Sequence, residues 1–239
     1  MLLALFLIDL AAGLYLFLPL VGRRNAGVKF YRMILIVSGA LMLCSLVGHY
    51  FPSTLAVILL TIIVYVFLRY PKRLILRVPA ALLALLYVAT AILVWREATG
   101  ASWVWSVLGA LSSIALLGSV NLAMLLGHWY LVVRGMSIDP LKVLTHATLA
   151  GAIVRLAVVG AALLMPGMWA AVAIRQGIFF WMRVGWGLVG PLALYPMVWG
   201  TVKIRSTMAA TGILYVDVVA VVIGEVLGGW LSALAHLPV

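Results

Sequence analysis

Long apolar runs alternate along this chain with short interruptions that contain charged residues, proline or glycine. A helix needs roughly 20 apolar residues to cross the hydrocarbon core of a bilayer. The runs predict eight transmembrane helices, at about residues 2–22, 33–51, 54–70, 78–95, 103–134, 141–165, 169–202 and 207–236. We therefore predict an all-α fold, a polytopic integral membrane helix bundle in which residues 1–239 form a single domain.

Composition agrees with this pattern. Hydrophobic residues make up 67% of the 239 residues and charged residues only 9%, whereas roughly a quarter of a typical soluble domain is charged. Such a chain lacks the polar residues needed to cover a water-soluble surface. We expect a multi-pass protein of the cell membrane, surrounded by lipid and without a sizeable domain outside the bilayer.

The basic residues cluster in the interruptions and predict an orientation. With eight helices, twelve of the sixteen Lys and Arg residues fall on one side: Arg23, Arg24, Lys29, Arg32, Arg69, Lys72, Arg73, Arg77, Arg134, Lys142, Lys203 and Arg205. Because Lys and Arg accumulate in short cytoplasmic loops, both termini are expected on the non-cytoplasmic side. The formal charge of +11 then reflects topology, and no nucleic acid partner is predicted.

Several kinds of chemistry have no local support in the sequence. Cys44 is the only cysteine, so disulfides within the chain, thiolate-ligated iron–sulfur clusters and cysteine-based zinc sites are excluded. Walker, GxGxxG, HExxH and GxSxG patterns are absent. No metal site is predicted, catalytic residues cannot be assigned, and the question of enzymatic activity stays open.

Four charged residues fall inside predicted helices of the second half: Arg155, Arg183, Asp217 and Glu225. A charge at the bilayer centre costs at least ~2.5–3.5 kcal/mol, so each of these side chains should face protein or water and have a partner. Distances along the helices place Arg155 and Asp217 both ~15–21 Å from the cytoplasmic side, and Arg183 and Glu225 in the outer half. We expect these two pairs, either as links between helices or as a charged, hydrated path for protons or a polar head group.

Three further features concern a charge within a helix, a helix break and the tryptophans. Asp9 lies in the middle of the first predicted helix, where Arg155 is the one basic residue at matching depth. The seventh predicted helix contains Pro191 and Pro196 and should be kinked, because an interior proline removes a backbone hydrogen bond. Five tryptophans near predicted membrane interfaces are expected in aromatic belts: Trp95, Trp103, Trp105, Trp169 and Trp230.

Histidines suggest a second candidate site. His128 and His146 are expected at similar depth near the cytoplasmic face, and Asn121 lies seven residues before His128 on nearly the same helix face. Imidazole can ligate haem iron or hydrogen-bond a quinone carbonyl. Helices joined by a short loop pack ~8–10 Å apart, which argues against one haem held by both histidines. His49 and His236 are expected near the outer helix ends.

These residues lead to a functional hypothesis. The leading interpretation is a membrane-anchor or electron-transfer subunit of a larger redox complex that binds quinone, with haem b as a second candidate cofactor. His128, His146, Asn121 and Arg155 are the candidate cofactor-binding residues, and Arg183, Asp217 and Glu225 the candidate charge pathway. Other membrane or peripheral subunits are expected as partners. One alternative is a proton-coupled transporter or channel that uses the intramembrane charges; another is a structural subunit without chemistry of its own.

Overall fold

The predicted helix bundle is confirmed. A computed structural model describes residues 1–48, 52–68, 73–133 and 135–239; the described chain contains no strand, and the structure is 89% helical. Its elements are α1 (Leu2–Val21), α2 (Arg23–Gly48), α3 (Pro52–Phe67), α4 (Arg73–Thr99), α5 (Trp103–Val132), α6 (Asp139–Leu163), the π-helical η1 (Trp169–Ile174), α7 (Gly177–Met182), the π-helical η2 (Arg183–Val189), α8 (Gly190–Lys203) and α9 (Thr207–Ala235).

Seven helical segments of the described chain are long and apolar enough to cross a membrane, with Gly177–Lys203 counted as one. The remaining predicted span corresponds to α3, an apolar helix of 16 residues. Both α2 and α4 begin earlier than predicted, at Arg23 and Arg73. In α4 the helix continues through basic residues that hydropathy does not count as lipid-embedded, whereas α2 contains a break at Gly27 (φ 77°), which separates a short basic piece from the long apolar one. The predicted ends at 49–51 and 69–70 lie outside the described residues.

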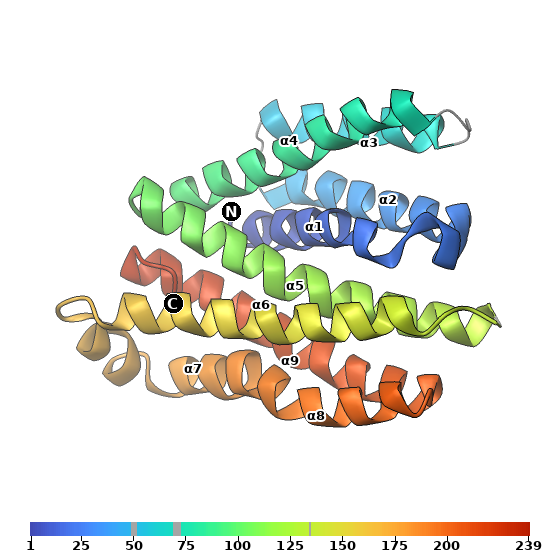
Figure 1. The fold of residues 1–239 in the computed structure, drawn as a ribbon. Helices are drawn as coiled ribbons and strands as arrows, with labels where there is room; N and C mark the ends of the chain where they lie inside the picture. The colour runs from blue at the N-terminus through green and yellow to red at the C-terminus, as the bar shows by residue number, and fades with distance from the viewer. Residues whose placement is uncertain (49–51, 69–72, 134) are drawn as a thin grey trace.

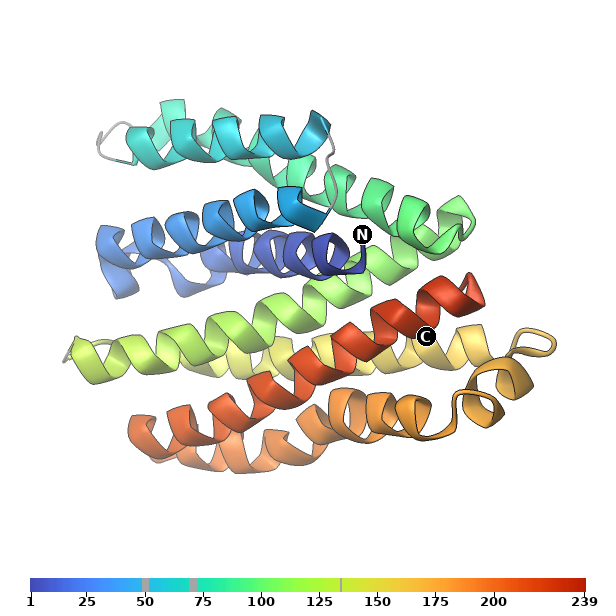
Figure 2. The ribbon, with the colours of Figure 1, turned by 180° about the vertical axis from the view of Figure 1, so that it is seen from behind.

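The helices form two groups joined along α1 and α5 (Figure 1). In one group, α5 packs against α6 and α9, and α8 packs against the same two helices, so that α6 and α9 occupy opposite corners. In the other group, α2 and α4 pack against α1, and α3 packs against α2 and α4. Seen from behind, α9 runs obliquely across the bundle (Figure 2). This inclination decides which charged residues meet.

Glycines allow two of the helix crossings to be very close. A Cβ atom added at Gly13 of α1 would lie 2.5 Å from the Cα of Gly118 in α5. Similarly, a Cβ atom at Gly224 of α9 would lie 2.2 Å from the Cα of Gly187 in η2. Close backbone approach through small residues is a common way for membrane helices to associate. Here it brings η2 and α9 together beside their charged side chains.

The segment predicted as a seventh, kinked helix is interrupted. It consists of η1, α7, η2 and α8, and Pro191 is the second residue of α8, directly after the π-helical turn η2. Pro196 lies inside α8. Such π-helical turns often occur at functional sites. In this chain the second π-helical turn, η2, begins with the buried Arg183.

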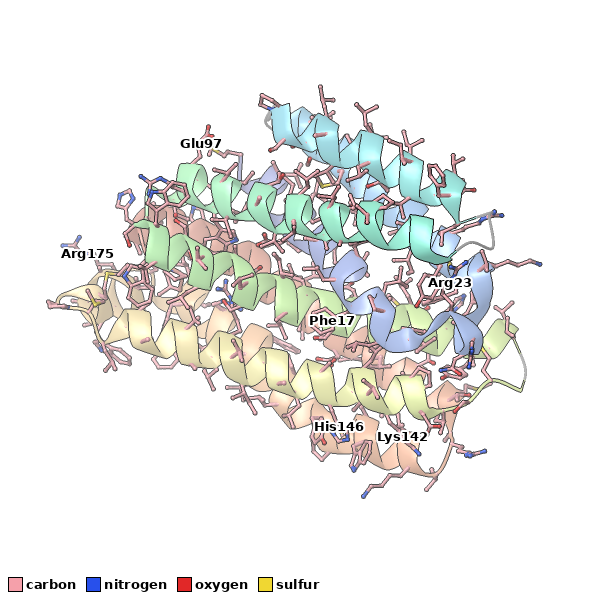
Figure 3. The ribbon with its side chains drawn as sticks, turned by 45° about the horizontal axis from the view of Figure 1, so that its top comes forward. Phe17, Arg23, Glu97, Lys142, His146 and Arg175 are labelled. Carbon is pink, nitrogen blue, oxygen red and sulfur yellow. The ribbon has the colours of Figure 1, made fainter. Side chains whose placement is uncertain are left out.

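The two ends of the bundle differ in charge. Figure 3 shows Arg23 and Lys142 at one end and Glu97 and Arg175 at the other. Both chain termini lie toward the end with Glu97 and Arg175 (Figures 1 and 3). This arrangement agrees with an even number of crossings. Which end faces the cytoplasm stays a prediction based on the basic loops.

Candidate functional site

Arg155 and Glu225 form the centre of a buried ion cluster inside the group formed by α5, α6, α8 and α9. Arg155 of α6 donates from Nε to Oε1 of Glu225 (3.1 Å) and from Nη2 to Oε2 (2.9 Å). Its Nη1 donates to Oγ of Ser112 in α5 (3.1 Å) and, at 3.5 Å, to the carbonyl of Gly109. The side chain of Arg155 is 0% exposed and that of Glu225 only 2%. The geometry is the bidentate pairing that makes arginine–carboxylate contacts strong.

Arg183 is the second cation of this cluster. Its Nη2 lies 2.9 Å from Oε1 of Glu225, and its side chain is fully buried. None of the three guanidinium nitrogens of Arg183 meets the geometry of a hydrogen bond within the described chain, so its contact with Glu225 is an ion pair by distance. One carboxylate therefore faces two guanidinium groups, and the less well bonded of the two retains unused donors. Because an unpaired buried donor costs free energy, Arg183 is less favourably bonded than Arg155.

Glycines provide the space that Arg183 occupies. A Cβ atom added at Gly187 would lie 2.8 Å from Nη1 of Arg183, and one added at Gly228 would lie 2.7 Å from its Nε. A Cβ atom at Gly224 would lie 3.2 Å from Nη1. The guanidinium group thus lies against backbone on α9 and η2. The same glycines that allow the two helices to approach also make room for the cation.

Asp9 joins the cluster from α1. Nε1 of Trp95 in α4 donates to Oδ2 of Asp9 (2.7 Å), and both residues are about 1% exposed. The ring centroid of Trp95 lies 5.4 Å from Cζ of Arg155, a cation–π distance. Asp9 is also close enough to Arg155 and Glu225 to interact with both electrostatically. Trp95 therefore connects α1 and α4 of one helix group with α6 of the other.

These contacts test three sequence predictions, of which two are wrong and one is confirmed. The expected pair of Arg155 with Asp217 is wrong: α9 runs obliquely, so Glu225 rather than Asp217 reaches Arg155. The expected contact of Arg183 with Glu225 is confirmed. Trp95 is a buried core residue and not a belt residue, because depth along a helix does not reveal which face the side chain occupies.

Asp217 lies apart from the ion cluster. It is 1% exposed, and its Oδ1 has no hydrogen-bond partner among the described residues. Asp217 and Glu225 are eight residues apart on α9, which corresponds to ~12 Å along the helix. α9 thus carries two buried carboxyl groups in different environments, one of them bound to two arginines.

A cavity of about 510 Å³ lies beside Glu225, between α1, α7 and α9. Glu225 is the one charged residue among the described residues that line it. The other wall residues are apolar, aromatic or glycine, and include Phe6, Phe179 and Trp230. Phe179 and Trp230 meet edge to face, with ring centroids 5.3 Å apart. Mostly apolar walls with one well-placed polar group are typical of small-molecule sites of this size.

The histidine candidates are on the outside of the bundle. His128 is exposed and its Nδ1 lies 3.3 Å from the hydroxyl of Tyr215 on α9. His146 is exposed too (Figure 3), and its Nδ1 lies 3.0 Å from the hydroxyl of Tyr195 on α8. The described contacts of the two imidazoles thus lead to different helices. Among the described contacts, no residue is shared by the two imidazoles.

The remaining candidates are accounted for by local contacts. Asn121 is buried and donates from Nδ2 to the carbonyl of Leu117 in its own helix (2.8 Å). His236 ends α9 in a left-handed conformation (φ 56°) and contacts the carbonyl of Thr99. His49 lies outside the described residues. Within the described chain, no group of three or more His, Cys, Asp or Glu residues could hold a metal ion.

Sequence reasoning missed part of the site. Ser112, Trp95 and the aromatic walls of the cavity were not assigned to it. An apolar residue gives no sign of lining a cavity until the helices are assembled, and a serine inside a helix is equally common where it bonds its own backbone. The one available signal was the position of Asp9, since a carboxyl group in the first helix required a donor at matching depth.

Comparison with known proteins provides no relative from which a role could be transferred. No protein-family model matches the sequence, and neither a curated protein nor a solved structure matches the chain. The class of the protein therefore follows from its own fold and site: a polytopic membrane helix bundle with a buried arginine–glutamate cluster beside an apolar cavity.

Proposed function

We propose that this protein is a membrane-embedded subunit of a larger redox complex and that it binds a quinone, in its quinol form, in the cavity beside Glu225. The observation that carries the proposal is the cavity itself: about 510 Å³ with apolar and aromatic walls and one charged residue. A polar solute or a hydrated ion would lose its hydrogen bonds in such a space. An amphipathic aromatic ring suits it.

Glu225 favours the quinol form for a chemical reason. An ionised carboxylate only accepts hydrogen bonds, so a ligand that binds it must supply a donor. A quinol hydroxyl supplies that donor, whereas a quinone carbonyl does not. Oxidation of a quinol to a quinone releases two electrons and two protons. Glu225, held ionised by two arginines, would accept a hydrogen bond from one hydroxyl and orient the ring, the two protons would leave to the aqueous phase at the membrane surface, and the two electrons would pass to a redox centre in a partner subunit.

The two arginines give this carboxylate its charge and its orientation. Arg155 holds both oxygens of Glu225, and Arg183 contacts Oε1. Neither arginine is among the residues that line the cavity. Their role in the proposal is therefore positioning. Haem b is not carried into this proposal, because His128 and His146 contact different helices on the outer surface.

The proposal is tested on protein purified from its native membrane in mild detergent. Solvent extraction and chromatography should yield an isoprenoid quinone in an amount comparable to the protein, together with co-purifying subunits that carry redox centres. A pyridine haemochrome spectrum should show no haem assigned to this chain. Purified protein without quinone and without redox partner subunits would contradict the proposal and leave the buried ions as structural links.

A second candidate function is supported by Asp217. A buried carboxyl group without a cation beside it is typical of proton paths in transporters, and Asp217 is such a group within the described chain. A proton-coupled transporter would show proton-dependent substrate flux in liposomes, and Asp217→Asn would abolish the coupling. Flux that is unchanged in Asp217→Asn would remove this candidate.

A further inference from the structure

A second cavity, distinct from the one beside Glu225, lies among the first four helices. Its volume is about 310 Å³, and residues of α1, α2, α3 and α4 line it. It contains Tyr15, Tyr31 and Arg23 together with small residues of α4 such as Ala80 and Ala84. The volume is at the lower end of the range of ~300–1,000 Å³ for ligand sites, which suits a narrow ligand.

Apart from Arg23, the walls of this cavity offer a ligand no unbonded polar group. The hydroxyl of Tyr15 donates to the carbonyl of Ala80 (3.0 Å), and that of Tyr31 donates to the carbonyl of Leu18 (3.1 Å). Both hydroxyl groups are thus already bonded to backbone. The remaining lining residues other than Arg23 are aliphatic or proline. A ligand would therefore place hydrocarbon here.

Positive charge surrounds the same part of the molecule. Arg23 is half-buried, and its single described hydrogen bond is a long one from Nη2 to the carbonyl of Leu68 (3.5 Å). Arg24 and Lys29 follow in the chain and are exposed. Figure 3 shows Arg23 at the basic end of the bundle, opposite Glu97. A guanidinium group with unused donors next to this apolar cavity is complementary to a phosphate ester attached to an acyl chain.

We propose that the cavity formed by Tyr15, Tyr31, Ala84 and Arg23 binds one anionic phospholipid, with an acyl chain inserted between α1 and α4 and the phosphate at Arg23. Phosphate recognition by arginine and attraction of anionic head groups to basic residues give the site its preference. This site is independent of the cavity beside Glu225 and of the function proposed for it.

The test uses full-length protein reconstituted in phosphatidylcholine bilayers with and without phosphatidylglycerol. Lipid that stays bound after extraction is identified by native mass spectrometry. Wild-type protein should retain phosphatidylglycerol in preference to phosphatidylcholine. Arg23→Gln should weaken that retention about fivefold, the effect of roughly one basic contact, whereas Arg24→Gln, which removes the same charge one residue away, should leave it unchanged.

A second pair of variants tests whether the acyl chain occupies this cavity. Ala84→Trp fills the cavity and should abolish retention of both lipids. Ala89→Trp, on the same helix at an exposed position outside the cavity, should have no effect. Equal retention of the two lipids by wild-type protein, or equal losses in Arg23→Gln and Arg24→Gln, would overturn the proposal. If Ala84→Trp does not fold, the comparison of the two arginine variants still decides.

Discussion

Arg155 and Glu225 are joined by two nearly parallel hydrogen bonds, Nε to Oε1 at 3.1 Å and Nη2 to Oε2 at 2.9 Å. The pair crosses the centre of the group formed by α5, α6, α8 and α9. They come from α6 and α9, helices at opposite corners of that group. The pair therefore links two helices that pack mainly against α5 and α8 and not against each other. Because Arg183 of η2 meets the same carboxylate, Glu225 joins α6, η2 and α9 at a single point.

Loss of the negative charge at this point should be severely destabilising. Glu225→Gln removes the carboxylate that both buried guanidinium groups contact, and breaking a buried ion pair costs roughly 3–5 kcal/mol. We expect a clear fall in the thermal unfolding midpoint of the detergent-solubilised protein. Asp139→Asn is the control, because the ion pair of Asp139 with Lys142 (3.3 Å) is exposed and its loss should leave the midpoint unchanged. Similar midpoints for both variants would contradict the central place of Glu225.

The two arginines should respond differently to lysine. Arg155→Lys removes the bidentate pairing and the contact with Ser112, whereas Arg183 makes one described ion-pair contact and has unused donors. We expect Arg155→Lys to cost about 1–2 kcal/mol more than Arg183→Lys, since lysine cannot reproduce the planar fork of arginine. Chemical denaturation of the two variants side by side measures the difference. An equal cost, or a larger one for Arg183→Lys, would contradict the described geometry.

The crossing of α1 and α5 should not accept a methyl group. A Cβ atom at Gly118 would lie 2.4 Å from the Cα of Gly13, which forces the helices apart. Overpacking of this kind costs roughly 1–3 kcal/mol, so Gly118→Ala should lower the unfolding midpoint. Gly212→Ala on α9 is the matched control: no neighbouring atom lies within 4 Å of a Cβ there, and alanine favours helix more than glycine does. Gly212→Ala should be neutral or stabilising.

Trp95 should matter for its N–H group as well as for its volume. Trp95→Phe keeps an aromatic ring near Arg155 but removes the donor to Asp9. An unsatisfied buried polar group costs about 1–3 kcal/mol, and the smaller ring leaves a further gap. Trp103→Phe serves as the control, because Trp103 is 53% exposed and stacks on Arg96 at the end of the bundle. Unfolding midpoints that fall equally in both variants would argue against a specific bond to Asp9.

The bundle of long apolar helices followed from the sequence because hydropathy averaged over about 20 residues indicates which segments can cross a bilayer, although seven rather than eight described segments are long enough to do so. The position of each residue along its helix was also predictable, which is why Arg183 was correctly paired with Glu225. What one sequence does not contain is the inclination of each helix and the direction that each side chain faces. Because α9 runs obliquely, Glu225 reaches Arg155, and Trp95 lies on the face of α4 that points into the bundle.

The histidines illustrate the same limit. His128 and His146 were placed by sequence at the same end of neighbouring helices, and that depth suggested a shared site. Their described partners are Tyr215 and Tyr195, on α9 and α8. The glycines could have been more informative: Gly224 and Gly228, on the same stripe of α9 as Asp217, turned out to border Arg183. Small residues beside an intramembrane charge indicate where a second helix can approach.

The most direct test of the proposed function is quinol binding to two α9 variants one heptad apart. Val226 is 50% exposed and lines the cavity beside Glu225, whereas Val219 is 57% exposed and does not line it. Binding of a short-chain quinol to purified protein is measured by titration, with the thermal unfolding midpoint as a check on folding. The predicted result is loss of saturable binding in Val226→Trp and wild-type affinity in Val219→Trp. Unchanged binding in Val226→Trp, or no saturable binding by the wild-type protein, would contradict a quinol site at Glu225.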